Sequence, residues 1–118
     1  MKRNEIYYVT FGNKNKGSEQ SGIRPAVILQ NDKGNENSPT TIVAPLTTKQ
    51  KSLYLPIHIE IEKDNKNNLN ENSVLLLEQI ITIDKSRILN KIGVIEDKDL
   101  INKINKGLKT SLALFKIW

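Results

Sequence analysis

Short runs of β-branched, aromatic and other apolar residues, separated by turn-forming residues, follow one another along most of this chain. Each run has the length of a strand, and one shows the alternation of polar and apolar residues that is typical of a half-buried strand. Another is continuously apolar, which indicates a strand buried on both faces. The runs predict five strands and favour a sixth, at residues 6–11, 25–30, 40–44, 55–61, 73–78 and 88–95.

Only the C-terminal segment has the apolar period of a long amphipathic helix. Asp97 or Glu96 is placed to cap its first turn. Gly107 lies inside the pattern and costs about 1 kcal/mol relative to alanine, so the helix depends on docking to the sheet rather than on its own propensity. The apolar stripe contains Leu100, Ile101, Ile104, Leu108, Leu112 and Phe115.

One domain accounts for residues 1–118, since a chain of this length is too short to divide into two self-sufficient cores. Residues 12–22 and 62–72 are polar connections without an apolar period, and we expect both to be surface loops. Neither is long enough to separate domains. Short strands followed by one helix predict a mainly β (α+β) fold, in which the helix closes or covers a small barrel-like sheet.

The net charge of +5 and the pI of about 9.5 favour contact with polyanions such as nucleic acid. An A-rich coding sequence would produce the same abundance of lysine and asparagine, so the charge alone leaves this open. The chain has no cysteine, which excludes disulfides, thiolate metal sites and cysteine nucleophiles. We expect a cytoplasmic protein without membrane contact, because no apolar stretch resembles a signal peptide or a membrane span.

Several common catalytic motifs are absent from the sequence. It has no HExxH, no GxxxxGK(S/T) phosphate loop and no GxGxxG, so zinc-dependent hydrolysis, nucleotide hydrolysis and dinucleotide binding have no support. With one histidine and no cysteine, an enzyme that needs neither metal nor cofactor is the simplest that remains.

The most suggestive polar stretch ends in Arg24, directly before a proline that opens a strand-like run. Pro25 restricts the residue before it to extended backbone geometry, and so fixes where the guanidinium leaves the sheet edge. On this pattern alone a surface salt bridge is the commoner role for Arg24, and a phosphate ligand is the alternative.

Seven segments of the chain carry a resemblance to a known family. They are residues 17–20, 24–25, 29–32, 38–40, 43–47, 55–58 and 77–85. In this order and at this spacing they are similar to the MazF/PemK family of toxins, and they extend over nearly the whole chain. The sequence departs from the family at Asn4 and Glu5, where many relatives have a Gly-Asp pair, and we expect a local difference in the turn.

The resemblance implies a small SH3-like β-barrel of the MazF/CcdB type, with short helices and a C-terminal amphipathic helix. It also implies a homodimer that holds single-stranded RNA, such as mRNA, in a groove between the subunits. Family members cleave RNA without a metal: the ribose 2′-OH attacks the phosphorus, leaving a 2′,3′-cyclic phosphate and a 5′-OH. Because loss of messages inhibits translation and growth, a MazE-like antitoxin is expected, binding through an acidic C-terminal segment.

Matched by position, the resemblance places the catalytic residues at Arg24 and Thr47. Thr48 is adjacent, and a one-residue slip between the two threonines stays open. A guanidinium remains charged at neutral pH and is a poor proton acceptor, so we interpret Arg24 as stabilising negative charge on the phosphorane. The Thr47 hydroxyl is expected to donate a further hydrogen bond.

Other matched positions are expected to bind RNA rather than to take part in the chemistry. Glu and Gln side chains can read the base edges of unpaired RNA, although Glu78 could equally be a strand-end residue paired with a lysine or a backbone amide. His58 is the obvious general base on its chemistry, but a lone histidine in a strand is more often a structural or binding residue. The RNA-binding positions are Ser18, Glu19, Gln20, Asn31, His58, Glu78 and Gln79.

Two other functions are compatible with the same fold. CcdB-type toxins share it but act on DNA gyrase by protein contact, without nuclease activity. A non-enzymatic RNA-binding domain would keep the groove and lose catalysis. The presence of Arg24 together with Thr47 favours the ribonuclease over both.

Overall fold

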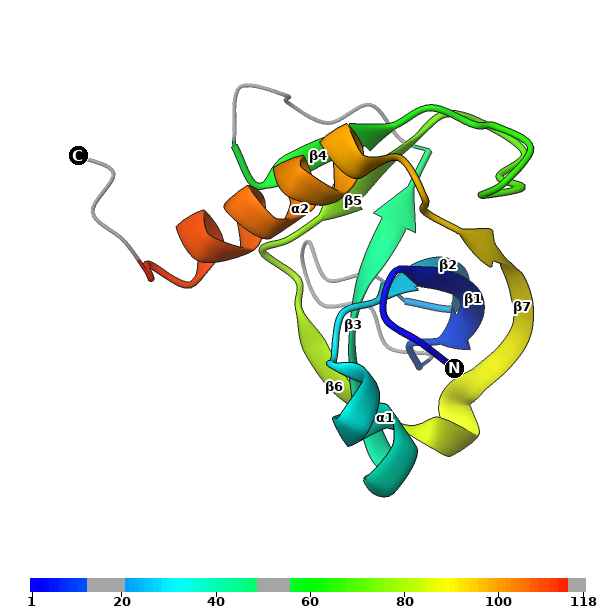
Figure 1. Cartoon of the computed structure of the whole chain (residues 1–118). Coiled ribbons are helices and arrows are strands. Elements are labelled where there is room, and N and C mark those ends of the chain that lie inside the picture. Colours follow the sequence, from blue (N-terminus) through cyan, green and yellow to red (C-terminus); the bar gives the residue numbers. More distant parts are fainter. Residues whose placement is uncertain (13–20, 49–55, 115–118) are drawn as a thin grey trace.

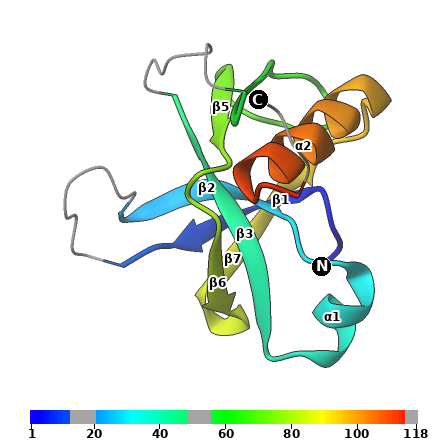
Figure 2. The same ribbon diagram turned by 90° about the vertical axis from the view of Figure 1, so that its left-hand side faces the viewer.

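The computed structural model (Figures 1 and 2) describes residues 1–12, 21–48 and 56–114. Strands dominate this part of the chain, and no helix in it is long and apolar enough to cross a membrane. In chain order the elements are β1 (Glu5–Thr10), β2 (Ile23–Ile28), α1 (Asp32–Asn37), β3 (Thr40–Thr47), β4 (His58–Ile61), β5 (Ser73–Leu76), β6 (Ile81–Asp84), the 3-10 helix η1 (Lys85–Arg87), β7 (Ile88–Val94) and α2 (Lys98–Ser111).

The strands pair antiparallel and bend around the long strand β3. Residues 43–45 of β3 pair with β2 on one side, while residues 40–43 pair with β6 and residues 46–47 with β5 on the other. Within the described residues the main path runs β4-β5-β3-β2-β1-β7, so the sheet is curled rather than closed by strand pairing (Figure 1). The predicted mainly β fold, with a helix covering a small barrel-like sheet, is confirmed.

Apolar side chains on both faces of the central strands form two clusters. Along β2, Val27 belongs to the larger cluster, whereas Ala26 and Ile28 belong to the smaller one, because successive side chains in a strand point to opposite faces. α2 covers the larger cluster with Ile104, which is fully buried. The continuous apolar run contains β5, and all four residues of this strand are buried, as predicted.

Helix α2 is capped by Asp97, one of the two predicted residues, whose side chain accepts a hydrogen bond from the Asp99 backbone N–H at 3.0 Å. Gly107 is buried, and a Cβ at this position would lie 2.7 Å from Leu77 Cδ1 and 3.3 Å from the Pro56 carbonyl oxygen. The glycine therefore lets α2 approach the sheet closely. Its cost in helix propensity is offset by this packing, which accounts for the predicted dependence on docking.

Strand β4 is shorter than the predicted run of residues 55–61. It begins at His58, because residues 56 and 57 form a turn, while Leu55 lies outside the described residues. Pro56 has no backbone N–H to give to a neighbouring strand, which explains why the ladder does not start there.

The sequence pattern alone does not predict β6 or α1. β6 has the alternating sequence ITID, but it is only four residues long and only Ile83 in it is buried, so the run is too short to stand out as a strand. α1 has the polar sequence DKGNEN, and its stability depends on contacts outside the helix. One of these is the buried Asn35 Oδ1, which accepts a hydrogen bond from Thr41 Oγ1 at 2.6 Å. The short helices implied by the resemblance are confirmed in α1.

The polar connection of residues 62–72 has no strand or helix, as predicted, but it is ordered by its own side chains. Asp64 Oδ1 accepts a hydrogen bond from the Asn67 backbone N–H at 2.7 Å, and the 2% exposed Asn67 accepts one from the Asp64 N–H at 3.1 Å. Gly93 of β7 packs directly on this turn, since a Cβ there would lie 2.4 Å from the Asn67 carbonyl oxygen. The connection is therefore fixed against β7.

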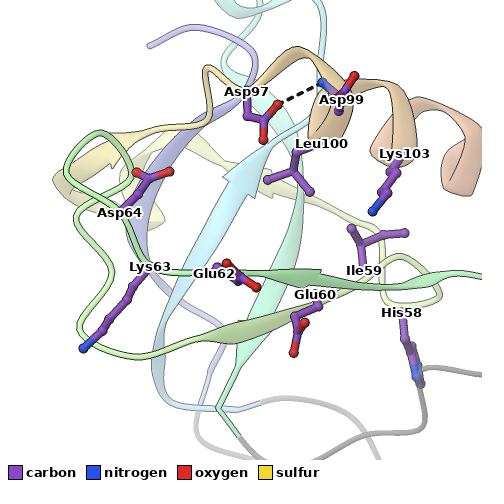
Figure 3. A pocket seen from close by; sticks show the side chains of 10 residues that line it. All are labelled: His58, Ile59, Glu60, Glu62, Lys63, Asp64, Asp97, Asp99, Leu100 and Lys103. Carbon is purple, nitrogen blue, oxygen red and sulfur yellow. Dashed lines mark hydrogen bonds between the residues drawn. The ribbon is translucent and has the colours of Figure 1, made fainter.

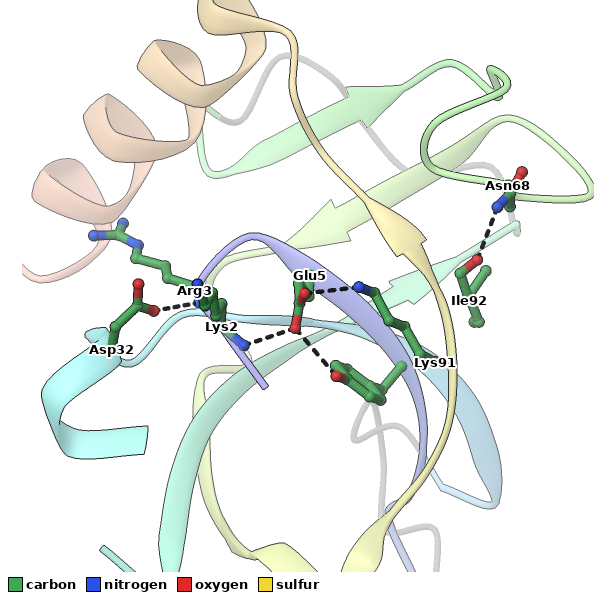
Figure 4. A network of polar contacts seen from close by, with 8 residues as sticks. Lys2, Arg3, Glu5, Asp32, Asn68, Lys91 and Ile92 are labelled. Carbon is green, nitrogen blue, oxygen red and sulfur yellow. Dashed lines mark hydrogen bonds and ion pairs between the residues drawn. The ribbon is translucent and has the colours of Figure 1, made fainter. Parts of the chain in front are cut away.

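Glu5 links the N-terminal residues to β7 (Figure 4). Its carboxylate accepts hydrogen bonds from the Lys2 backbone N–H at 2.7 Å and the Tyr7 hydroxyl at 3.1 Å, and pairs with Lys91 Nζ at 2.7 Å. Burial raises the pKa of this carboxyl, but the hydrogen bonds from Lys91, Lys2 and Tyr7 outweigh it, so the pKa of Glu5 lies below its ordinary value. Asn4 beside it has a φ of +73°, a conformation that asparagine tolerates, so the missing family glycine is accommodated.

Glu5→Gln is expected to destabilise the protein at pH 7 and much less at pH 3. Because the folded pKa is lowered, the carboxylate stabilises the fold above the ordinary pKa of 4.5, and this contribution is lost as the pH falls through the folded value. Loss of the charge-assisted hydrogen bonds corresponds to about 1–2 kcal/mol at pH 7. Urea denaturation at both pH values measures the difference, with the exposed Glu36→Gln as the control. An equal deficit at both pH values would contradict this account.

Candidate active site

The pairing of β2 with β3 relates the two predicted catalytic residues. Ala26 pairs with Pro45, and the register runs on through Val27 and Ile28. The pairing ends at Ala26 and Pro45, so Arg24, two residues before Ala26, and Thr47, two residues after Pro45, lie beyond the paired residues at the same end of the two strands. Because residues two apart in a strand share a face, both side chains project from the face that holds the smaller apolar cluster.

Arg24 lies within β2 and is half-buried, so the extended geometry that Pro25 was expected to impose is present. Its Nε donates a hydrogen bond to the Ser21 carbonyl at 2.8 Å. In the described ranges no carboxylate forms an ion pair with Arg24, and the surface salt bridge has no support there. Ser21 carries no signal in the sequence, because it contributes a backbone carbonyl that any residue type would supply.

The two adjacent threonines differ in their surroundings. Thr47 is the last residue of β3, is 2% exposed and pairs with Val74 of β5. Thr48 follows the strand and is exposed. Alternate residues of a strand share a face, so Thr47, but not Thr48, falls on the face that carries Arg24. The pairing of the strands therefore favours Thr47 over Thr48 as the residue that acts with Arg24.

His58 and Glu78 are brought together by the pairing of β4 with β5. The His58 Nε2 and Glu78 Oε2 atoms lie 2.6 Å apart, with the histidine side chain 7% exposed and the glutamate side chain 38% exposed. In the alternative to RNA binding, Glu78 was expected to pair with a lysine or a backbone amide. Its partner in the structure is His58 instead. The pair fixes the glutamate side chain at the surface edge of the sheet, where part of its carboxylate can still meet a ligand.

The remaining predicted RNA-binding residues do not form one group in the described structure. Asn31 is exposed at the end of β2 remote from Arg24, where its side chain caps α1 by accepting a hydrogen bond from the Gly34 N–H at 2.8 Å. Gln79 is half-buried directly after Glu78. Ser18, Glu19 and Gln20 lie outside the described residues.

A pocket of about 500 Å³ lies between β4, the following turn and the first turns of α2 (Figure 3). Five carboxylates and two lysines line it, with His58 at one end and the apolar Ile59 and Leu100 between them. This excess of negative charge repels phosphate groups, so we expect RNA to bind elsewhere. Among the described residues, no group of three or more suitable side chains is arranged to hold a metal ion. The charged lining residues are Glu60, Glu62, Lys63, Asp64, Asp97, Asp99 and Lys103.

Comparison with known proteins identifies the family. Residues 2–112 match the family described as the PemK-like, MazF-like toxin of type II toxin-antitoxin systems, and the chain belongs to this family. It is 44% identical over 117 residues to the endoribonuclease MazF of Staphylococcus saprophyticus, covering 99% of this chain and 95% of the relative. It is 42% identical over 114 residues to the endoribonuclease EndoA of Bacillus subtilis, covering 97% and 96%.

Solved structures show the same fold. A mycobacterial endoribonuclease in complex with its cognate antitoxin superposes with a TM-score of 0.79 at 22% identity, covering 99% of each chain. MazF from Deinococcus radiodurans superposes with a TM-score of 0.77 at 20% identity, covering 96% of each. At these identities the likeness supports the curled sheet and its helices, while the family assignment depends on the sequence relatives.

Proposed function

We propose that this chain is the toxin of a type II toxin–antitoxin pair and acts as a sequence-specific, metal-independent endoribonuclease on single-stranded RNA. The observation that carries the proposal is the pairing of β2 with β3, which puts Arg24 and Thr47 at the same end and on the same face of the two strands, in a chain whose relatives are named endoribonucleases. Cleavage of mRNA in the cytoplasm inhibits translation and growth. The gyrase-binding alternative finds no comparable support in these relatives.

The chemistry follows from the groups at the two strand ends. The ribose 2′-OH attacks the neighbouring phosphorus and the bond to the 5′-oxygen breaks, leaving a 2′,3′-cyclic phosphate and a 5′-OH. Negative charge accumulates on the non-bridging oxygens in between. The guanidinium of Arg24 donates charge-assisted hydrogen bonds to those oxygens, and the hydroxyl of Thr47 donates another.

Assembly and partners belong to the same proposal. Two copies form a homodimer with an RNA groove between them, in which Glu78 and Gln79 read base edges. A MazE-like antitoxin occupies that groove with an acidic C-terminal segment, for which the +5 charge of this chain is suited. The mycobacterial and Deinococcus structures of related folds in complex with antitoxins agree with such a partnership.

Digestion of a long RNA in EDTA tests the activity and its chemistry together. We expect discrete cuts at a short recognition sequence, with cyclic phosphate and 5′-OH ends, and no cut when the nucleotide before the scissile bond is 2′-deoxy. Products with 3′-hydroxyl ends would contradict the mechanism. Intact RNA with tight gyrase binding would support the CcdB-like alternative, and intact but bound RNA would support a non-enzymatic domain.

Thr47→Val and Thr48→Val distinguish the two threonines. Valine removes the hydroxyl with little change in shape, so Thr47→Val is expected to lower the cleavage rate constant by roughly tenfold to a hundredfold, the value of a hydrogen bond to a charged group. Thr48→Val is expected to cleave within about twofold of the original protein. Single-turnover cleavage of a labelled oligoribonucleotide measures both, and the reverse pattern would assign the role to Thr48.

A further inference from the structure

The connection between β1 and β2 is closed at its base by two glycines. The Phe11 N–H donates to the Gly22 carbonyl at 2.8 Å, and the Gly22 N–H donates to the Gly12 carbonyl at 2.7 Å. Gly12 has a φ of +96° and Gly22 a φ of +75°. We call Gly12 and Gly22, with the hydrogen bond between them, the glycine clasp.

Backbone conformation, not space, requires glycine at both positions of the clasp. Within the described residues, and apart from its two chain neighbours, a Cβ built on either residue would have no atom within 4 Å. Left-handed backbone geometry costs an ordinary L-residue roughly 1–2 kcal/mol, whereas glycine adopts it freely and asparagine tolerates it. A β-branched residue at Gly22 therefore opposes the clasp through its backbone conformation.

One peptide group connects the clasp to Arg24. The Gly22 N–H that bonds to Gly12 and the Ser21 carbonyl that accepts from Arg24 Nε, at 2.8 Å, belong to the same Ser21–Gly22 peptide. This unit is planar, and its N–H and carbonyl point in opposite directions. Anchoring the N–H to Gly12 therefore fixes the direction in which the carbonyl meets the guanidinium.

We infer that the glycine clasp positions Arg24 for catalysis through the Ser21 carbonyl. Because Nε is engaged by this carbonyl, the guanidinium presents its terminal Nη1 and Nη2 edge to the phosphate, and rotation of the side chain about its long axis is restricted. The inference rests on the proposed ribonuclease function and adds Gly22 as a positioning residue. Preorganised donors act without reorganisation as charge develops, which is why their orientation contributes to the rate.

Gly22→Val and Gly22→Asn test the inference as a matched pair. Valine, which disfavours the positive φ, is expected to lower kcat about tenfold or more with little change in KM, and asparagine is expected to recover most of that loss. In an Arg24→Ala background, Gly22→Val is expected to cause no further loss, because residues that act through one another are not additive. An equal loss in both backgrounds, or normal kcat in a folded Gly22→Val, would overturn the inference. Gly22→Ala replaces the valine variant if that protein does not fold.

A readout without RNA separates this inference from the proposed function. In ¹⁵N NMR spectra the Arg24 Nε–H is expected to exchange slowly in the original protein and in Gly22→Asn, and rapidly in Gly22→Val. If the original protein does not cleave RNA, this signal still tests the clasp. Equal exchange in all three proteins would refute the coupling even where RNA is cleaved normally.

Discussion

Arg24→Ala is expected to lower the rate constant of RNA cleavage by about two to three orders of magnitude, the typical loss on removing one preorganised donor to a developing negative charge. The side chain extends from the start of β2 and forms no ion pair in the described residues, so its removal is expected to leave the fold intact. Single-turnover cleavage measures the loss, and thermal unfolding and size-exclusion chromatography show whether fold and assembly persist.

Two further arginine variants make this test specific. Arg87→Ala removes an exposed arginine of η1 and is expected to cleave at nearly the original rate. Arg24→Lys keeps the charge but loses the planar fork of donors, so it is expected to recover only part of the activity. Near-normal turnover in Arg24→Ala, or an equally severe loss in Arg87→Ala, would refute the assignment of Arg24.

Gly93→Ala is expected to destabilise the fold by about 3 kcal/mol or more, at or beyond the upper end of ordinary overpacking. The new Cβ would lie 2.4 Å from the Asn67 carbonyl oxygen and 2.5 Å from the Lys66 carbonyl oxygen. Both obstacles are backbone atoms of a turn held by Asp64, and so no side-chain rotation relieves them. Urea denaturation measures the loss in free energy of unfolding.

Asn90→Ala provides the control for this glycine. Asn90 lies in the same strand, β7, and is exposed, so the substitution is expected to change stability by less than about 0.5 kcal/mol. Stability in Gly93→Ala equal to that of Asn90→Ala would show that the turn of residues 62–72 can move away from β7 at little cost.

Periodicity and propensity predicted the elements whose side chains have one buried face. The C-terminal apolar stripe corresponds to α2 as far as its C-cap Leu112, Phe115 lies outside the described residues, and Asp97 was among the predicted caps. β6 and α1 could not be predicted in this way, because their order comes from partners distant in sequence. β6 is held by pairing with β3, and α1 by contacts such as that between Asn35 and Thr41. Such tertiary contacts override local preference.

In the candidate site, too, some features could be predicted from the sequence and others depend on how the strands pair. Pro25 indicated the extended geometry of Arg24 from sequence, and the resemblance supplied Thr47 as its companion. Their relation across neighbouring strands depends on the register of β2 with β3, which no residue spacing encodes. The contact between His58 and Glu78 likewise arises only once β4 and β5 pair. Ser18, Glu19 and Gln20 stay predictions, because they lie outside the described residues.

The acidic pocket beside α2 makes the charge distribution of the protein asymmetric. Its charged side chains sum to −3 while the whole chain carries +5, so the remainder of the protein carries +8. This asymmetry orients an approaching polyanion before contact, because the acidic pocket repels it and the basic remainder of the protein attracts it. The association rate with RNA should therefore exceed that expected for random collisions at low ionic strength, and should decline as added salt screens the imbalance.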